Sequence, residues 1–413
     1  MKITKIVMIT SGQPSLNPRL VKEADALVAE GYEVIVIYQY WNDWGTIMDE
    51  ELLSQKKWKA IRAGGSPNDK KLLYWFTRFT HKIGYLIANH LFKSSIVDLL
   101  IIGRCTHSLI ALAKLHKANL YIGHNLAALP AAVKAAKQHG AKCGFDAEDF
   151  HRNETTNNKQ HPDYQLKVRI ENEYLPKVDY LTTASSFIAK AYKHLYPILE
   201  PLVINNVFLS SFSQSVILKK QDLDLKLFWF SQTIGKNRGI EDAIKAIALL
   251  KRPNINLTLL GKINKIDLDY FLALADQLGL AKNQLNFIPP VQPNNIFKLA
   301  NSYDIGLALE PAFCLNNDIA LSNKIFTYLT SGLAVIASET LAQKVFLNKY
   351  PLIGMSFPIG NVSLLAKIID RYDQDRAFLY QTKLNSFQLA TERLNWELES
   401  IKFIKIIKQT LLN

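Results

Sequence analysis

The sequence predicts an α/β protein with two doubly wound parallel sheets, one after the other along the chain. Apolar, β-branched segments that suit buried strands alternate with amphipathic segments that suit helices. The alternation is lost at residues 210–224, which are rich in Ser, Gln, Lys and Asp, and then starts again. A chain of 413 residues with 48% hydrophobic content is also too long for one ordinary core. We therefore expect two Rossmann-like domains, residues 1–208 and 209–394, followed by a helix at 395–413.

The first domain opens with a strand, a loop, a helix and a second strand. Residues 3–9 and 33–38 are apolar runs, and the helical pattern at 19–30 between them ends where Gly31 stands. This order is typical of a parallel sheet with crossover helices. Further strands are expected at 97–102, 120–122 and 180–183, with a helix at 126–139.

The second domain repeats the pattern. We expect strands at 225–230, 256–260, 285–288, 305–309 and 333–337, and helices at 240–250, 270–278, 295–300 and 324–330. Ligands bind at the carboxyl ends of the strands in such sheets, so two of these domains facing each other form a cleft that holds the site.

Composition argues against several classes of protein. The N-terminal apolar run at 6–9 is too short for a signal peptide, and no apolar stretch approaches the roughly 20 residues that span a bilayer. Three widely spaced cysteines, Cys105, Cys143 and Cys314, predict neither a disulfide framework nor a zinc site. We therefore expect a cytoplasmic protein.

The net charge of +13 favours an acidic partner, which is nucleic acid, anionic lipid or a phosphorylated substrate. The sequence has no zinc-finger spacing, RNA-recognition aromatic signature or long basic tract. We therefore place nucleic acid last and expect no nucleic-acid partner.

The most informative segment is residues 322–338. It reads as a helix that begins at Ser322 or Asn323, ends at Gly332 and leads directly into a buried strand. Backbone amides at the start of such a helix can hold a diphosphate. On local pattern alone, an ordinary helix and strand is the favoured alternative.

The same segment resembles the nucleotide-binding signature of family-4 glycosyltransferases, which have the GT-B fold of two Rossmann-like domains facing across a cleft. In order, that signature has asparagine, lysine, an aliphatic residue, Phe, Glu, Tyr, three variable residues, Gly, one variable residue, Pro, Val, Ile and Ala. This sequence differs at two positions, because Thr327 stands where the signature has Glu and Ala334 stands where it has Pro. The resemblance implies that Ser322, Asn323 and Lys324 hold the diphosphate of a sugar nucleotide. It also implies that Thr327 meets the ribose hydroxyls, with weaker hydrogen bonds than a carboxylate makes. The resemblance covers nearly the whole chain and is strongest over residues 225–340.

The loop after the first strand of the second domain is similar to the family's loop with the pattern Gly, Arg, four variable residues, Lys and Gly. Arg238 stands at the Lys position before Gly239, whereas the usual Arg is missing near Gln232. We expect Lys236 or Lys324 to supply the second charge, and both positive groups to stabilise a leaving diphosphate without a metal ion. We also expect Ser231 and Gln232 to bind the donor. The alternative for this loop is a solvated turn with scattered basic residues.

Glu310 resembles the first residue of the family's motif of two glutamates separated by seven residues, which lies near the donor sugar. The loop at 312–321 is longer than that spacing allows. A solvated carboxylate at the end of a strand is the alternative.

Polar residues also follow two strands of the first domain. His124 stands at the end of one strand, where the resemblance implies contact with the reacting sugar, and a structural histidine is the alternative. Asp146, Glu148, Asp149 and His151 follow the next strand and are candidates for binding acceptor hydroxyls. An acid–base role for His151, a metal site and a plain acidic loop are alternatives.

The first loop, residues 11–19, lacks the spacing of glycines that marks a dinucleotide fold. The family commonly has a loop here that closes over donor and acceptor, which makes Gly12 and Arg19 candidates for acceptor binding. Three Asp-x-Asp pairs, at 222–224, 267–269 and 373–375, fall in linker or helical contexts. We therefore expect no metal ion and no cofactor besides the donor substrate.

Residues 70–93 mix aromatic and basic side chains at helical spacing. Such a helix can lie on an anionic membrane surface, with rings at the headgroups and cations near lipid phosphates. It can equally pack on the sheet with a basic outer face, and the sequence leaves both alternatives open.

The resemblance as a whole implies a glycosyltransferase that moves a sugar from a nucleoside diphosphate sugar to a hydroxyl of a glycan or lipid-linked acceptor. It implies retention of anomeric configuration, a role in cell-surface polysaccharide or glycolipid assembly at the inner membrane face, and a final helix that packs back on the first domain. Two alternatives stay open. One is a sugar-nucleotide epimerase of the same fold, and the other is a catalytically silent GT-B binding protein, because Thr327 replaces the usual Glu.

Overall fold

The computed structural model describes residues 3–90, 94–213 and 224–412, and it divides into two compact units. The first unit contains Met1–Asn205, Cys314–Asn316 and Ser400–Asn413, and the second contains Asn206–Phe313 and Asn317–Glu399. Most of the segment expected to link the domains, residues 214–223, lies outside the described residues, as does Asp222 of the first Asp-x-Asp pair.

A seven-stranded parallel sheet forms the centre of the first unit, in the order β3-β2-β1-β4-β5-β6-β7. Its strands are β1 (Lys5–Thr10), β2 (Glu33–Gln39), β3 (Lys59–Ala63), β4 (Leu120–His124), β5 (Lys142–Ala147), β6 (Tyr180–Thr183) and β7 (Leu202–Val203). Strand β1 pairs with both β2 and β4, and Thr10 at its end lies level with His124 of β4. The chain order therefore reverses direction between β1 and β4.

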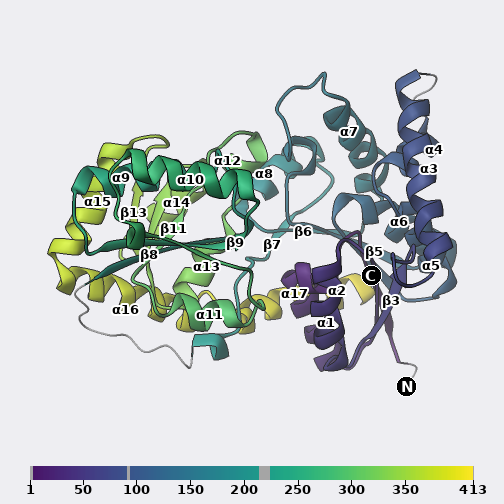
Figure 1. Cartoon of the computed structure of the whole chain (residues 1–413). Helices are drawn as coiled ribbons and strands as arrows, with labels where there is room; N and C mark the ends of the chain where they lie inside the picture. The colour runs from purple at the N-terminus through teal and green to yellow at the C-terminus, as the bar shows by residue number, and fades with distance from the viewer. Residues whose placement is uncertain (1–2, 91–93, 214–223, 413) are drawn as a thin grey trace. The chain divides into compact units, whose positions relative to one another are not determined.

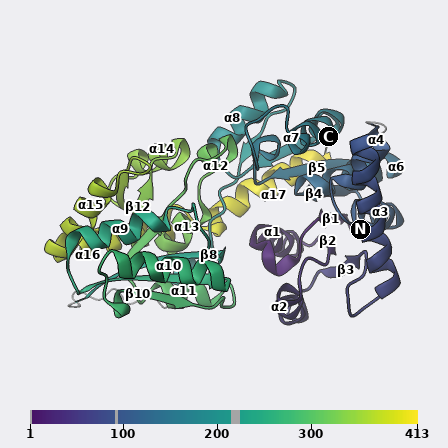
Figure 2. The ribbon, with the colours of Figure 1, turned by 45° about the horizontal axis from the view of Figure 1, so that its top comes forward.

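Helices cover both faces of this sheet because its crossovers run in two directions from β1 and β4. Right-handed crossovers place α1 on one face and α5 with α6 on the other. Figure 2 shows α1 on the opposite side of the strands from α3 and α6. The helices of this unit are α1 (Pro18–Ala29), α2 (Asp43–Ser54), α3 (Lys71–His90), α4 (Ser95–Ile101), α5 (Thr106–Leu115), α6 (Leu129–His139), α7 (Pro162–Tyr174), α8 (Ser186–Leu195) and most of α17 (Trp396–Leu412).

A six-stranded parallel sheet forms the centre of the second unit, in the order β10-β9-β8-β11-β12-β13. In Figure 1, α9 and α10 cover one face of this sheet and α11 and α13 cover the other. Its strands are β8 (Leu225–Thr233), β9 (Ile255–Lys262), β10 (Leu285–Ile288), β11 (Ile305–Ala308), β12 (Ala334–Ser338) and β13 (Gly354–Phe357). Its helices are α9 (Ile240–Leu250), α10 (Lys265–Gln277), α11 (Asn295–Ala300), most of α12 (Leu315–Ile319), α13 (Asn323–Thr330), α14 (Leu341–Lys349), α15 (Val362–Gln374) and α16 (Arg376–Glu392).

The prediction of two successive parallel sheets is confirmed, but one predicted strand is wrong. Residues 97–102 fall largely in helix α4, where the Ser94 side chain accepts a hydrogen bond from the amide of Val97 and caps the helix. Helix α4 packs closely on α3, since a Cβ added to Gly84 would lie 2.8 Å from Leu100. A short apolar run buried on several sides has the same sequence pattern in a strand and in a helix.

Within the described residues, no single helix is long and apolar enough to cross a membrane. Helices α4 and α5 meet the length and composition test only when they are taken as a pair, and the chain bends by 102° between them.

Candidate functional site

In the second unit, the predicted site residues gather where the sheet changes its winding direction. Strands β8 and β11 are neighbours in the sheet, and the crossovers that leave them run in opposite directions. Loops that follow two such strands diverge and leave a crevice at the carboxyl edge, where ligands bind in open α/β sheets. The loop before α9 follows β8, and the segment that contains Glu310 follows β11.

The loop between β8 and α9 carries Arg238 and lies against the end of β11. Ser231 and Gln232 are among the last residues of strand β8, which ends at Thr233. The Arg238 guanidinium donates a hydrogen bond of 2.5 Å to the carbonyl of Thr233. Gly239 caps α9 with a φ of 77°, and a Cβ added there would lie 2.8 Å from the Cβ of Leu309. The position therefore requires glycine both for its backbone conformation and for this close approach.

Glu310 is held by three side chains from the segment that follows it. Its carboxylate lies 2.6 Å from the Lys324 ammonium, and it accepts hydrogen bonds of 2.9 Å from Ser322 and 3.0 Å from Asn317. Burial acts to raise the pKa of Glu310, but the Lys324 charge and these hydrogen bonds outweigh it and lower the pKa. Glu310 is therefore a fixed negative charge that orients Lys324.

Two predicted cations meet at one aromatic ring. The Arg238 guanidinium carbon lies 5.4 Å and the Lys324 ammonium 5.7 Å from the centre of the Trp229 ring. Both distances are within the range of cation–π attraction. Trp229 is fully buried, and its indole N–H has no hydrogen-bond partner among the described residues. Sequence reasoning missed Trp229 because it reads as one of several aromatic core residues of its strand.

Lys236 lies apart from this cluster. Its side chain is exposed, and its ammonium lies 4.0 Å from the centre of the Tyr270 ring. Of the two residues predicted to supply the second charge, Lys324 is therefore the one that shares an aromatic ring with Arg238.

Helix α13 begins beside Glu310. The Ser322 hydroxyl donates to Glu310 and makes no capping hydrogen bond within the described structure, so the positive end of the helix dipole is not covered by this side chain. Asn323 is the first helical residue and is exposed. Thr327, one turn later, is 3% exposed, and its hydroxyl donates to the Asn323 carbonyl at 3.4 Å.

In the first unit, a buried cluster of four charged residues brings together three predicted site residues and one that was missed. Arg19 donates two hydrogen bonds of 2.7 Å to Asp146, while a ring nitrogen of His124 lies 3.5 Å from Asp146 and the other 3.3 Å from Glu23. None of the four is more than 2% exposed. Glu23 follows Arg19 by four residues on α1, so the two face the same way, and that spacing is the signal that could have found it.

The cluster is electrically balanced and shifts the pKa values of its members. Burial alone would lower the pKa of His124, but the Glu23 and Asp146 carboxylates raise it to about 9. Burial would raise the pKa of Asp146, whereas Arg19 and His124 lower it well below its usual range. Two cations and two anions therefore compensate one another in the interior.

The predicted acceptor loop after β5 is built around local hydrogen bonds. Asp149 accepts a hydrogen bond of 2.9 Å from the side chain of Asn316, and a ring nitrogen of His151 lies 3.4 Å from Glu154. Burial acts to lower the pKa of His151, but Glu154, Asp149 and Glu171 raise it. His151 is buried, whereas Glu148 and Asp149 are partly exposed.

Gly12 follows the last residue of β1 by two positions, and its amide donates a hydrogen bond of 3.1 Å to the Thr10 hydroxyl. It is part of the same strand edge as His124, with which Thr10 is level. Across residues 3–90, 94–213 and 224–412, no group of three or more His, Cys, Asp or Glu side chains could hold a metal ion.

No protein-family model matches the chain, and no curated sequence matches it significantly. Solved structures match it over nearly its whole length. Anabaena HepE in complex with UDP-glucose is 15% identical with a TM-score of 0.70, and covers 98% of this chain and 99% of its own. Sucrose-phosphate synthase from Thermosynechococcus elongatus is 13% identical with a TM-score of 0.71, and covers 98% of each chain.

A glycosyltransferase from Rickettsia africae is 14% identical with a TM-score of 0.69, and covers all of both chains. At these identities the likeness establishes the architecture and nothing finer. The two parallel sheets, of seven and six strands with flanking helices, match the GT-B fold, which this chain shares with these structures.

Proposed function

We propose that the protein is a glycosyltransferase that uses a nucleoside diphosphate sugar, and that its second unit binds this donor. The observation that carries the proposal is the meeting of Arg238 and Lys324 at the Trp229 ring, beside the start of α13. Two positive charges and a helix N-terminus at one sheet edge suit a diphosphate.

The same groups suit the chemistry of transfer. The bond from the anomeric carbon of the sugar to the diphosphate breaks, and negative charge grows on the departing oxygen. Arg238, Lys324 and the amides around Ser322 and Asn323 stabilise that charge, with Ser231, Gln232 and Gly239 shaping the diphosphate loop. The acceptor hydroxyl forms the new bond to the anomeric carbon and loses its proton to the departing diphosphate or to solvent.

Glu310 and Thr327 complete the donor site in this proposal. Glu310 orients Lys324 and lies at the strand end where the sugar would be bound. Thr327 would turn its hydroxyl from its own helix to the ribose, a weaker contact than a carboxylate would make. Lys236, which is exposed, would act only on the outer phosphate charge.

For the first unit we propose that Glu148 and Asp149 bind acceptor hydroxyls, because both are partly exposed and lie directly after the end of β5. Arg19, His124 and Asp146 are too buried to meet a ligand directly in this conformation, so they act as positioning residues for the ends of β1, β4 and β5. His151 and Gly12 support the same edge of the sheet.

The donor class is tested by calorimetric titration with UDP and UDP-glucose, since UDP-glucose is bound in the HepE structure. We expect binding by the wild-type protein and about tenfold weaker binding by Arg238→Ala, because one charge-assisted contact to phosphate is worth about 1.5 kcal/mol. Lys298→Ala is the matched control, since it removes an exposed positive charge from α11 of the same unit.

If neither UDP nor UDP-glucose binds, a thermal-shift screen with other nucleoside diphosphates and their sugars shows whether the protein binds a nucleotide with a base other than uracil. Binding that is equal for wild type, Arg238→Ala and Lys298→Ala would contradict the proposed diphosphate site. Once a donor and an acceptor are known, we expect the product to retain the donor's anomeric configuration, which NMR coupling constants of the product report.

We also propose that the acceptor is a glycan or a lipid-linked glycan and that the protein works at the inner face of the membrane, in cell-surface polysaccharide or glycolipid assembly. The support is the high positive charge of the chain and an apolar, basic helix on the surface of the first unit. Anionic lipid attracts such a surface.

A further inference from the structure

Helix α3 carries large apolar side chains on the face that it turns to solvent. Leu72 is 89% exposed, and Trp75, Phe76 and Phe79 are each more than 60% exposed. Leu86, two turns farther along, is 54% exposed. Their spacing of three, four and seven residues places all five on one stripe of the helix.

The opposite side of α3 is the one that packs on the protein. Thr77 is buried, and a Cβ added to Gly84 would lie 2.8 Å from Leu100 and 2.9 Å from Ile101 of α4. His81 lies 2.7 Å from the Leu100 carbonyl. The helix therefore buries small and polar groups and exposes aromatic ones, the reverse of the usual arrangement on a globular protein.

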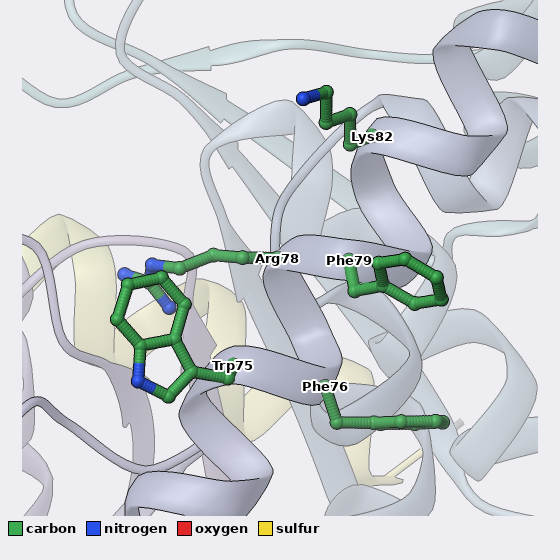
Figure 3. A pocket seen from close by; sticks show the side chains of 5 residues that line it. All are labelled: Trp75, Phe76, Arg78, Phe79 and Lys82. Atoms are coloured by element: carbon green, nitrogen blue, oxygen red, sulfur yellow. The ribbon is translucent and has the colours of Figure 1, made fainter.

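Positive side chains flank one edge of the apolar stripe. Figure 3 shows Phe76 and Phe79 directed to one side of the helix, and Trp75, Arg78 and Lys82 to the other. These five residues line an open hollow of about 490 Å³. The Arg78 guanidinium stacks on Tyr74, 3.3 Å from its ring centre, whereas Lys82 and Lys71 extend into solvent.

From this arrangement we infer that α3 is the surface by which the protein docks on an anionic lipid bilayer, with the helix lying parallel to the membrane. Leu72, Trp75, Phe76, Phe79 and Leu86 enter the boundary between headgroups and acyl chains, while Lys71 and Lys82 meet lipid phosphates. Helices that lie in a membrane interface combine an apolar face with aromatic rings and a basic polar face in this way. A protein partner is the weaker choice, because the exposed charges beside the stripe are positive and match an extended anionic surface.

This inference rests on the proposed membrane location of the acceptor and names the surface responsible. It does not depend on transfer activity, because vesicle binding and nucleotide binding are measured separately. A protein that binds vesicles but no nucleotide would retain the docking surface and lose the proposed donor site.

The test is flotation of the full chain with vesicles of equal parts phosphatidylglycerol and phosphatidylcholine, and with phosphatidylcholine alone. We expect binding to the anionic vesicles that weakens with added salt. The triple variant Trp75→Ala, Phe76→Ala, Phe79→Ala should bind at least about tenfold more weakly, since each ring buries a large apolar area in the interface. The double variant Lys71→Ser, Lys82→Ser should lose about tenfold on anionic vesicles only.

The matched controls are Leu249→Ala with Ile266→Ala, which remove exposed apolar side chains of the second unit, and Lys298→Ser with Lys367→Ser, which remove exposed charges there. All variants change exposed side chains, so circular dichroism should show native folding. Equal binding by the α3 variants and their controls would overturn the inference, as would failure of the wild type to float at low salt. A wild-type protein that forms a stable dimer but does not bind vesicles, together with a triple variant that no longer forms the dimer, would also overturn the inference. In that case the apolar stripe of α3 would be an interface with a second copy of the chain.

Discussion

At the scale of single residues, the first unit is notable for a charged interior cluster. Arg19, Glu23, His124 and Asp146 are each at most 2% exposed, and they come from α1, β4 and β5. Removing one partner from such a cluster leaves another charge buried and costs about 3 to 5 kcal/mol. The cluster therefore secures the strand ends at which the candidate acceptor loops begin.

The first prediction concerns the protonation of His124. Its pKa is raised from the ordinary 6.5 to about 9, so the folded state holds the proton more tightly than the unfolded state. The resulting stabilisation is complete below about pH 6.5 and is lost as the pH rises through about 9, a change of about 3 kcal/mol. We expect the difference in unfolding free energy between wild type and His124→Gln to shrink by about this amount between about pH 6 and about pH 9.5.

The comparison with a variant is needed because Lys22 titrates in the same range. Burial, and to a smaller extent repulsion from Arg19, lowers the pKa of Lys22 to about 7. The contribution of Lys22 to stability therefore rises with pH over the range in which the contribution of His124 falls. Lys22 is present in both proteins, so its effect largely cancels in the difference. An NMR titration of the His124 ring with a midpoint near 6.5 would contradict the prediction directly.

At the scale of elements, the candidate donor site depends on how closely the loop before α9 approaches the end of β11. Gly239 begins α9 and lies against Leu309, which precedes Glu310. The loop carries Arg238, and Glu310 orients Lys324. A displacement of this one loop would therefore separate the two cations at Trp229.

The second prediction compares two glycines with the same left-handed backbone conformation. Gly239 has a φ of 77° and Gly279 one of 76°, but a Cβ at Gly239 would lie 2.8 Å from Leu309, whereas no described atom lies within 4 Å of one at Gly279. Each change to Ala should cost about 1 kcal/mol of stability from the positive φ. Only Gly239→Ala should also weaken UDP binding several-fold, because the loop must move.

Denaturant unfolding and calorimetric titration measure the two effects separately. If Gly279→Ala weakened nucleotide binding as much as Gly239→Ala, the close approach to Leu309 would not be the reason.

At the scale of the whole molecule, the first unit is completed by distant parts of the chain. The first unit takes Cys314–Asn316 and Ser400–Asn413 from the C-terminal half of the sequence. The last of these segments buries Phe403 and Ile407 completely, and Lys408 lies 2.6 Å from Glu30 at the end of α1. The first unit therefore depends for its core on residues that are synthesised last.

The third prediction follows from this arrangement. Phe403→Ala should destabilise the first unit by about 3 to 5 kcal/mol, because it removes a fully buried ring. Ile401→Ala, two residues earlier on the same helix and 64% exposed, should change the stability by no more than about 0.5 kcal/mol. UDP binding at low temperature should survive both changes, since the candidate donor residues belong to the second unit.

Denaturant unfolding followed by circular dichroism measures both variants. Equal stability of the two would mean that α17 adds little to the first unit.

Local pattern by itself determined the fold class and most of the strands, and the family resemblance of residues 225–340 indicated the segments that carry the candidate donor residues. The fold class was predictable because a short helix and the buried parallel strand after it are each formed by consecutive residues, as in the run from Ser322 to Ser338. It failed at residues 97–102, where burial on several sides removes the periodicity that separates a strand from a helix.

Tertiary structure alone decided which side chains meet. The sequence could not show that Lys324 rather than Lys236 joins Arg238 near the Trp229 ring, or that Glu23 completes the cluster around His124. These relations depend on strand order, which places β8 beside β11 and β1 beside β4. Strand order is set by the packing of segments that are far apart along the chain, so it cannot be predicted from the local pattern of neighbouring residues.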